Sequence, residues 1–327
     1  MKILVTGGLG FIGSNFIRYF LSRYPGHSII NLDKLTYAGN PHNLDGILEG
    51  PNYQFVRGDI ADPLVLSSIF EEKIDGVIHF AAESHVDRSI KDATEFIRTN
   101  VLGTYQLLKF SKHHKVGRFL HISTDEVYGE LGDKGAFTED SPIQPNSPYA
   151  ASKASADMIV KSFFRTHRLP VIITRCSNNY GPYQFPEKLI PLMISQAIRK
   201  LPLPVYGDGR NVRDWIYVLD HCKALAQVFF EGKEGEVYNI GGDGERTNLQ
   251  VVYEILDYLK KPRSLITFVK DRPGHDFRYA MDYTKIKNSL GWSPEVSFEE
   301  GIRKTIDWYL ENHRWWESIL AGTYQRV

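Results

Sequence analysis

The sequence predicts an α/β fold in which helices cover both faces of a parallel sheet, together with a smaller second α/β domain. Short apolar runs rich in β-branched residues alternate with segments of helical periodicity through the first half of the chain. That alternation is typical of βαβ units and of parallel sheets. A glycine-rich turn joins the first run to the first helical segment, which indicates the Rossmann-type, doubly wound variety of this fold.

Hydrophobic periodicity places the elements in chain order. Apolar residues at helical spacing predict helices over residues 11–21, Ala93–Phe110 and Tyr149–Thr166. Short apolar runs predict strands at Lys2–Thr6, Ser28–Leu32, Tyr53–Val56, Gly76–Phe80, Arg118–Ile122 and Pro170–Thr174.

The alternation weakens after Arg175, where prolines become frequent. One later run, Val237–Ile240, is strand-like and is expected to rejoin the sheet. We therefore expect a first domain over residues 1–176, with a return segment near 211–240, and a second domain mainly over residues 177–327.

The composition, with 42% hydrophobic and 24% charged residues in a chain of 327, is typical of a soluble globular protein. A formal net charge of zero gives no reason to expect nucleic acid or an anionic membrane as a partner. Cys176 and Cys222 lie far apart and show no metal-ligand spacing, so we expect no metal site. The sequence shows neither a membrane-spanning run nor a recognisable signal peptide, so we expect a cytoplasmic location.

The glycine-rich turn is the candidate cofactor site. Gly7, Gly10 and Gly13 lie between a strand and a helix, where glycines let the backbone approach a pyrophosphate at the helix N-terminus. Asp33 follows at the end of the next expected strand. A carboxylate there binds ribose hydroxyls and repels a 2′-phosphate, which favours NAD over NADP. Asp59, after the third strand, is placed to meet the adenine, although alone it is equally typical of a helix cap.

The candidate catalytic residues follow the fifth expected strand. Tyr149 and Lys153 lie four residues apart, so both project from one helix face. We expect Lys153 to lower the tyrosine pKa and to hold the nicotinamide ribose, so that Tyr149 acts as a base while hydride leaves a carbon. Thr124, at the end of the strand, is placed to form a hydrogen bond with the substrate hydroxyl that is oxidised. Alcohol oxidation needs only one base, so the adjacent Asp125 and Glu126 predict a further step, the loss of water from an oxidised sugar.

Seven segments of the chain together resemble the extended short-chain dehydrogenase/reductase family. Thr6–Gly13 and Tyr149–Lys153 mark only the superfamily, whereas Ser123–Gly129 is more specific because the family's epimerases lack the paired acids there. The remaining segments are Ala81–Ile90, Ser177–Pro182, Pro186–Pro191 and Asp271–His275. Within the family, the chain is most similar over nearly its whole length to the nucleotide-sugar 4,6-dehydratases that act on dTDP-glucose.

This resemblance implies a three-stage reaction. Tyr149 takes the C4 hydroxyl proton while NAD takes the C4 hydride. Glu126 then removes the C5 proton, which the new ketone has made acidic, and protonated Asp125 donates to the leaving C6 hydroxyl. Hydride finally returns to C6. The two acids must therefore differ in charge, and adjacent carboxylates in a closed pocket do push their pKa values apart.

The resemblance also assigns the remaining site residues. NAD is expected to meet Gly7, Gly10, Phe11, Ile12, Gly13, Asp33, Lys34, Leu35, Asp59, Ile60, Ala81, Ala82, Thr99, Tyr149, Lys153 and Asn179. The nucleotide-sugar is expected to meet Ser84, Thr124, Asn178, Lys188, Leu189, Pro204, Val205, Tyr206, Arg213, Asn248, Arg272 and His275. It further implies a homodimer built on the helices Ala93–Phe110 and Tyr149–Thr166, and a deoxysugar such as rhamnose as the end product.

Three alternatives remain open at this point. A dehydratase acting on UDP-glucose would carry the same catalytic residues. A nucleotide-sugar epimerase or decarboxylase would need the 4-keto intermediate but not both Asp125 and Glu126. A non-catalytic dinucleotide sensor would have little need of Tyr149, Lys153 and both acids together.

Overall fold

A computed structural model describes residues 1–47 and 50–325, and its centre is a seven-stranded sheet in which every neighbouring pair is parallel. The strand order is β11-β6-β5-β4-β1-β2-β3. The strands are β1 (Lys2–Thr6), β2 (Ser28–Asp33), β3 (Tyr53–Arg57), β4 (Gly76–His79), β5 (Arg118–Thr124), β6 (Val171–Cys176) and β11 (Val237–Ile240). The doubly wound α/β fold predicted from the sequence is confirmed.

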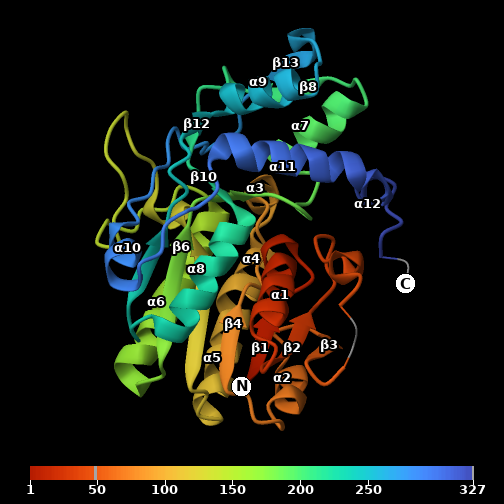
Figure 1. The fold of residues 1–327 in the computed structure, drawn as a ribbon. Helices are drawn as coiled ribbons and strands as arrows, with labels where there is room; N and C mark the ends of the chain where they lie inside the picture. The colour runs from red at the N-terminus through yellow and green to blue at the C-terminus, as the bar shows by residue number, and fades with distance from the viewer. Residues whose placement is uncertain (48–49, 326–327) are drawn as a thin grey trace.

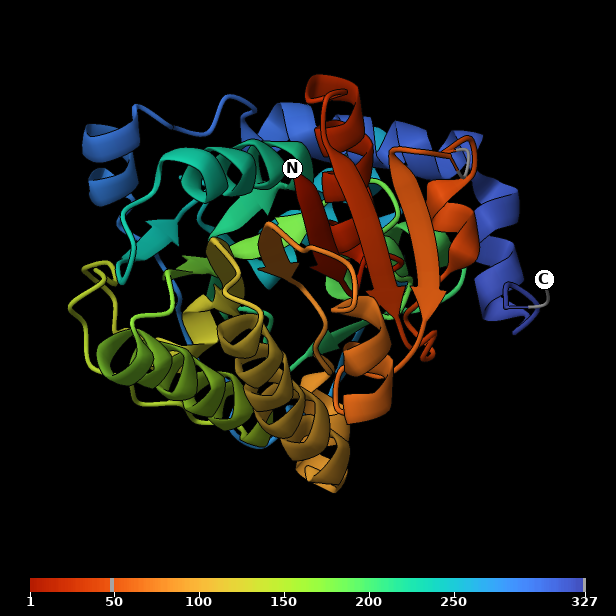
Figure 2. The same ribbon diagram turned by 90° about the horizontal axis from the view of Figure 1, so that it is seen from below.

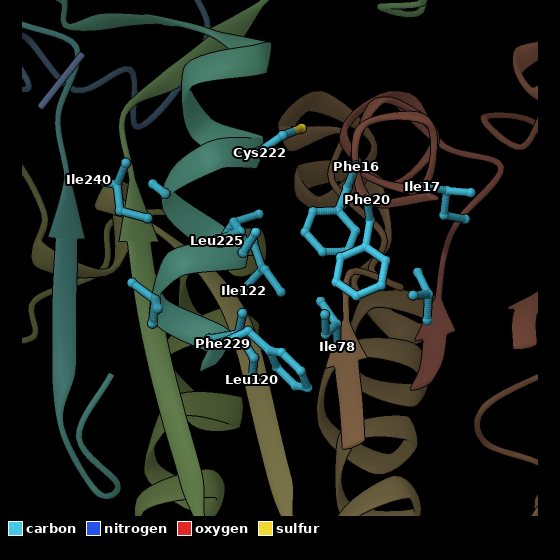
Figure 3. Close-up of a cluster of buried hydrophobic side chains, with 14 of the residues drawn as sticks. Phe16, Ile17, Phe20, Ile78, Leu120, Ile122, Cys222, Leu225, Phe229 and Ile240 are labelled. Atoms are coloured by element: carbon cyan, nitrogen blue, oxygen red, sulfur yellow. The ribbon is translucent and has the colours of Figure 1, made fainter. Parts of the chain in front are cut away.

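Helices cover both faces of this sheet, as the view from below shows (Figure 2). One face carries α1 (Phe11–Arg23) and α8 (Val218–Glu231). The other carries α2 (Pro63–Ile69), α5 (Thr104–His113) and α6 (Pro148–His167). In Figure 3 the rings of α1 face the aliphatic and aromatic side chains of α8 above the strands; the labelled residues are Phe16, Ile17, Phe20, Ile78, Leu120, Ile122, Cys222, Leu225, Phe229 and Ile240.

The helix expected over Ala93–Phe110 differs from a regular α-helix. It consists of α4 (Thr94–Phe96), a π-helical stretch (Ile97–Gly103) and α5. The wider turn carries Asn100, whose amide accepts from Glu83 N over 2.9 Å and donates to Ser152 Oγ over 2.8 Å. Periodicity does not reveal a π turn, because the apolar face before and after it stays the same.

The second domain lies beyond the carboxyl ends of the sheet strands, at the top of Figure 1. Its helices α7 (Leu189–Ile198), α9 (Asn248–Tyr258), α11 (Phe298–Glu311) and α12 (His313–Leu320) enclose a separate core. Its small sheets pair β7 (Asn178–Tyr180) with β10 (Trp215–Tyr217), β8 (Leu203–Tyr206) with β13 (Ile266–Val269), and β9 (Val212–Arg213) with β12 (Arg246–Thr247). The shorter helices are η1 (Pro41–Leu44), α3 (Val86–Lys91), η3 (Asp125–Tyr128), η4 (Arg263–Leu265) and α10 (Thr284–Leu290).

The chain passes between the two regions more than once. It leaves the large sheet after β6, forms β7 to β10, and returns through α8 and β11 to pair with β6. We propose the division at residue 176 for the two domains. The return segment expected near 211–240 begins later in this structure, at Val218 of α8, because β9 and β10 pair with strands of the second domain. In the described part of the chain, no helix has both the length and the apolar character that crossing a bilayer requires.

Candidate active site

A cavity of about 320 Å³ opens at the carboxyl ends of the sheet strands. The structure brings most of the expected site residues together in its wall: Gly7, Gly10, Phe11, Ile12, Gly13, Asp33, Lys34, Asp59, Ile60, Ala81, Ala82, Ser84, Thr99, Thr124, Asp125, Glu126, Tyr149, Lys153, Asn178, Asn179 and Lys188. Outside its wall lie Leu35, Leu189, Pro204, Val205, Tyr206, Arg213, Asn248, Arg272 and His275. Parallel strands end at one edge, which explains how residues so far apart in sequence meet here.

The glycine turn fits a closely approaching ligand. Gly7 has a φ of +73°, and a Cβ added to it would lie 2.6 Å from Ala81 N. A Cβ on Gly13 would lie 2.3 Å from the carbonyl oxygen of Gly7. Larger residues would therefore distort the turn that precedes α1, and the exposed backbone there suits the pyrophosphate of a dinucleotide.

The ribose end of the cavity is organised by Asp33. Its two carboxylate oxygens accept from Leu35 N over 2.8 Å and from Leu9 N over 2.9 Å. Burial raises the Asp33 pKa, and these two backbone hydrogen bonds oppose that rise. Lys34 Nζ lies 2.9 Å from Asp59 Oδ2, so its charge is already paired. This donor and acceptor set fits the unphosphorylated ribose of NAD better than a 2′-phosphate.

The start of α6 brings the tyrosine and lysine under the end of β5. Ser147 caps the helix by accepting from Ala150 N over 3.1 Å, and Pro148 occupies its first turn. Lys153 Nζ donates to the Ile122 carbonyl oxygen over 2.7 Å. Tyr149 N donates to Ser89 Oγ over 3.1 Å. Both side chains are buried in the cavity wall, as a hydride-transfer site requires.

The expected lowering of the Tyr149 pKa is not the net result in this arrangement. Burial raises the pKa of Tyr149 well above its usual value, and Glu126, Cys176 and Asp125 add to the rise. A side-chain hydrogen bond with Thr124 acts in the opposite direction. The Lys153 ammonium instead points to the Ile122 carbonyl oxygen, and its own burial lowers its pKa to about 8.

Asp125 is set up as a neutral acid. Its side chain is almost fully buried, with 2% of its surface exposed. Oδ1 accepts from Thr124 Oγ1 over 3.0 Å, whereas Oδ2 has no hydrogen-bond partner among residues 1–47 and 50–325. Burial first, and then the Glu126 charge, raise the Asp125 pKa well above its usual value. A protonated Oδ2 would be a donor directed at whatever occupies the cavity.

Glu126 has a more cationic environment than Asp125. Burial raises the Glu126 pKa, but the charges of Arg272, Arg213 and Lys188 each lower it. Asp125 is opposed by Arg213 alone among these cations. The pair is therefore biased towards a neutral Asp125 beside an ionised Glu126.

Arg272 and Tyr206, which lie outside the cavity wall, are linked to the first domain through Asp87 of α3. Arg272 Nη1 lies 3.3 Å from Asp87 Oδ1, and the Tyr206 hydroxyl donates to Asp87 Oδ2 over 3.2 Å. The Nε of Arg272 is buried without an acceptor among the described residues. A guanidinium with an unused donor at this place suits an oxyanion ligand.

The other expected second-domain residues are engaged within that domain. Arg213 donates to the carbonyl oxygens of Val212 over 2.7 Å and of Asp276 over 2.9 Å. The imidazole Nδ1 of His275 lies 2.6 Å from Asp271 Oδ1. In the part of the chain that the structure describes, no His, Cys, Asp or Glu residues gather in threes as metal ligands.

Several cavity residues were missed by the sequence analysis. They are Leu32, Thr36, Ala38, Gly39, Gly58, Phe80, Glu83, Ile122, Ser123, Cys176, Ser177, Gln184, Phe185 and Glu187. Most of them lie within a few residues of a motif identified in the sequence, and that proximity is the signal that could have predicted them. The loop at 36–39 had no such signal, because its place depends on how it folds back over Asp33.

Comparisons with known proteins agree with this geometry. The family model described as GDP-mannose 4,6 dehydratase matches residues 4–305. A dTDP-glucose 4,6-dehydratase of Neisseria meningitidis is 52% identical, with 99% of this chain and 97% of that protein covered. One from Xanthomonas campestris is 51% identical, with 98% and 97% covered.

The chain belongs to the dTDP-glucose 4,6-dehydratase family.

Solved structures support this membership in the dTDP-glucose 4,6-dehydratase family. DesIV of Streptomyces venezuelae, a dTDP-glucose 4,6-dehydratase crystallised with NAD and TDP, is 50% identical at a TM-score of 0.95, with 98% of this chain and 100% of that chain covered. A UDP-glucose 4-epimerase of Thermus thermophilus is 30% identical at a TM-score of 0.89, with 95% and 100% covered. The fold is thus shared with epimerases, and the higher sequence identity groups the chain with the dehydratases.

Proposed function

We propose that this chain converts dTDP-glucose to dTDP-4-keto-6-deoxyglucose and water with bound NAD. The observation that carries the proposal is the unequal pair of carboxylates in the wall of one cavity with Tyr149 and Lys153. An epimerase needs the tyrosine and lysine but has no use for a neutral acid beside an ionised base. The names of relatives at about half identity support dTDP rather than UDP as the nucleotide.

The cofactor would be held by the glycine turn, by Asp33 and by Lys153. NAD, when bound, supplies the removal of hydride from C4 and its return at C6. Tyr149 would take the proton of the C4 hydroxyl, and Thr124 would orient that hydroxyl. Because burial and the two acids raise the Tyr149 pKa, this role needs the positive charge of bound NAD to lower it. Lys153, fixed on the Ile122 carbonyl, would hold the nicotinamide ribose.

The two acids would perform the elimination. The C4 ketone makes the C5 proton acidic, and Glu126, whose ionised form is favoured by the charges of Arg272, Arg213 and Lys188, removes it. Asp125, kept neutral by burial, gives its proton to the C6 hydroxyl as water leaves. Asp125 then carries the negative charge and Glu126 the proton. Reprotonation of C5 restores the ionised Glu126, and Asp125 regains a proton from solvent, which in turn receives the C4 hydroxyl proton that Tyr149 took.

The diphosphate would be bound on the second-domain side by Arg272 and Arg213. A guanidinium binds two phosphate oxygens at once, which fixes both charge and orientation. Asp87 would release Arg272 in part as the diphosphate arrives, because both compete for the same guanidinium. Lys188, whose Nζ donates to the Ser84 carbonyl oxygen over 2.9 Å, adds a third positive charge that lowers the Glu126 pKa.

A homodimer is the assembly we propose. Large apolar side chains are exposed on the outer helices of one face: Ile97 at 58%, Leu102 at 44%, Tyr105 at 41% and Met158 at 44%. These helices, α5 with its π-helical start and α6, lie side by side in Figure 2. Sedimentation velocity should show a dimer for the natural chain and a monomer for Tyr105→Glu with Met158→Glu. Phe268→Glu, at an even more exposed ring in the second domain, should leave the dimer intact.

We place the enzyme in the cytoplasm, where reducing conditions suit Cys176 and Cys222, both of which are free and buried.

The function is tested by supplying purified protein with dTDP-glucose and NAD and identifying the product by mass and by NMR. A 4-keto-6-deoxy product is expected, and its absence would refute the proposal. Parallel reactions with UDP-glucose decide the nucleotide: we expect at least tenfold lower kcat/KM for UDP-glucose, which corresponds to about 1.4 kcal/mol.

A further inference from the structure

The segment that follows α12 folds back onto the first domain. In Figure 1 the chain descends from α12 along the side of the sheet that carries β2 and β3. There the Tyr324 hydroxyl donates to the Tyr37 carbonyl oxygen. Gln325 Nε2 donates to the carbonyl oxygens of Thr36 over 2.6 Å and of Gly39 over 3.2 Å. Three successive contacts thus tie the end of the second domain to the loop after β2.

This loop, residues 34–40, is part of the cavity wall. Thr36, Ala38 and Gly39 all line the cavity next to Asp33. The loop is held from its inner side, where Asn40 N donates to the Leu9 carbonyl over 3.0 Å. Tyr324 and Gln325 contact the loop from its outer side. The loop therefore lies between the glycine turn and these two residues, which we call the clasp.

An aromatic contact extends the clasp to a second loop. The ring of Phe185, which also lines the cavity, lies 5.6 Å from the ring of Tyr37 and 6.0 Å from that of Tyr324. Tyr324 is only 8% exposed, so its ring is buried between the two loops. Two loops that line the cavity are therefore joined through Tyr324, which itself lies outside the cavity wall.

The loop has a conformation that needs support. Leu35, directly after the first loop residue, has a φ of +56°, a value that costs free energy for a residue with a side chain. Such conformations persist where surrounding contacts over-determine them. The outer hydrogen bonds from Tyr324 and Gln325 are contacts of this kind.

We propose that Tyr324 and Gln325 are positioning residues that hold loop 34–40 closed over the dinucleotide and slow its release. The inference rests on the proposed binding of NAD. It has a chemical reason: the hydride taken from C4 returns to the same sugar, so a cofactor that left during the cycle would strand a 4-keto intermediate. A cofactor that ends each cycle unchanged also has no need to exchange.

The test measures release of NAD from the loaded protein. Natural protein, Tyr324→Phe, Gln325→Ala and the double variant Tyr324→Ala/Gln325→Ala are loaded with labelled NAD, freed of excess, and chased with unlabelled NAD. We expect release to be about threefold faster in each single variant and at least tenfold faster in the double variant, as lost hydrogen bonds of this strength imply. When the loaded enzyme is strongly diluted, its activity should fall most in the double variant, less in the single variants and least in the natural protein. Added NAD should restore the activity in each case.

Tyr258→Phe is the control. Like Tyr324→Phe it removes one tyrosine hydroxyl, here the donor to Asp307 Oδ1 over 2.8 Å, but Tyr258 is exposed and lies in the second domain outside the cavity wall. Its release rate should equal that of the natural protein. Gln325 is exposed, so Gln325→Ala keeps the test valid even where loss of the Tyr324 ring disturbs folding.

Equal release rates in Gln325→Ala, Tyr324→Phe and the natural protein would overturn the clasp while leaving the dehydratase proposal intact. A natural protein that takes up no NAD would instead refute the proposed function, and the two failures are thereby distinguished.

Discussion

Lys153 donates from Nζ to the backbone carbonyl of Ile122 across 2.7 Å, and this bond fixes the ammonium below the end of β5. The side chain is 5% exposed, and burial lowers its pKa to about 8, although the charge of Asp157 one helical turn further on opposes the shift. A lysine held in this way is costly for stability at neutral pH. Its retention is understandable only through its place beside Tyr149 in the cavity.

Lys153→Met should therefore stabilise the protein while abolishing its activity. Because the folded pKa of about 8 lies below the usual 10.5, the cost of burying the charge is fully present below about pH 8. From there to the usual pKa the folded natural protein binds fewer protons than the unfolded one, so its stability rises with pH. We expect urea denaturation at neutral pH to show a gain of about 1–3 kcal/mol for the variant, which vanishes near pH 11. A gain that does not change with pH would contradict this account.

Asp125→Asn and Glu126→Gln should separate elimination from oxidation. Both variants keep Tyr149 and Lys153, so the C4 hydride should still be removed in a single turnover. Reduced NAD should then accumulate, which is measured as an increase in its absorbance. Product formation should fall by about a hundredfold or more, as expected for loss of a general acid or base. Tyr149→Phe is the comparison, because it should block the appearance of reduced NAD itself. If the acid variants block oxidation as strongly as Tyr149→Phe, the roles assigned to the acids are wrong.

Arg272→Gln should weaken the binding of dTDP-glucose and change the pH dependence of kcat. The Arg272 charge lowers the pKa of Glu126, so its removal should raise that pKa and shift the acidic limb of the kcat profile to higher pH. The KM for dTDP-glucose should rise at least tenfold through loss of a phosphate contact. Arg246→Gln, which breaks an exposed pair with Glu299 in the second domain, should change neither quantity. An unshifted acidic limb would show that Arg272 does not tune Glu126.

Asp157→Asn should lower stability and change its dependence on acid. Burial alone would raise the Asp157 pKa, but the His121 imidazole, whose Nε2 lies 3.4 Å from Asp157 Oδ1, and the charge of Arg175 outweigh it and lower it to about 2. This stabilisation is present above the usual value of 3.8 and is lost as pH falls through about 2. Since Arg175 would be left buried without its partner, we expect a loss of about 3 kcal/mol at neutral pH in urea unfolding. The deficit should shrink on acidification, and one that stays constant would argue against the ion pair.

Most of the large sheet could be predicted because each strand carries its own recognisable sequence pattern. Lys2–Thr6 and Val237–Ile240 match β1 and β11 residue for residue, and the other strands differ by at most two positions at either end. Buried parallel strands are continuous apolar runs, so their pattern does not depend on their neighbours. The residues at their carboxyl ends, such as Asp33 and Thr124, could be placed at one edge for the same reason.

The electrostatics of the site were less predictable, because they depend on groups distant in sequence. The direction of the Tyr149 shift follows from burial and from Glu126, not from the lysine four residues away. The cations around Glu126 come from the second domain, where no periodic pattern indicates which arginine turns inward. The clasp of Tyr324 on loop 34–40 joins residues nearly at opposite ends of the chain and has no local signal at all.

The position of β11 beside β6 has a consequence for synthesis of the chain. β6 is complete at Cys176, yet the strand that covers its outer edge begins only at Val237. While residues 177–236 are still being made, a nascent chain displays the free backbone donors and acceptors of that apolar strand. Such an edge is a template for pairing with other chains. Translation that stalls in this interval should therefore yield aggregating fragments, and the ribosome-bound chain should need chaperone protection there.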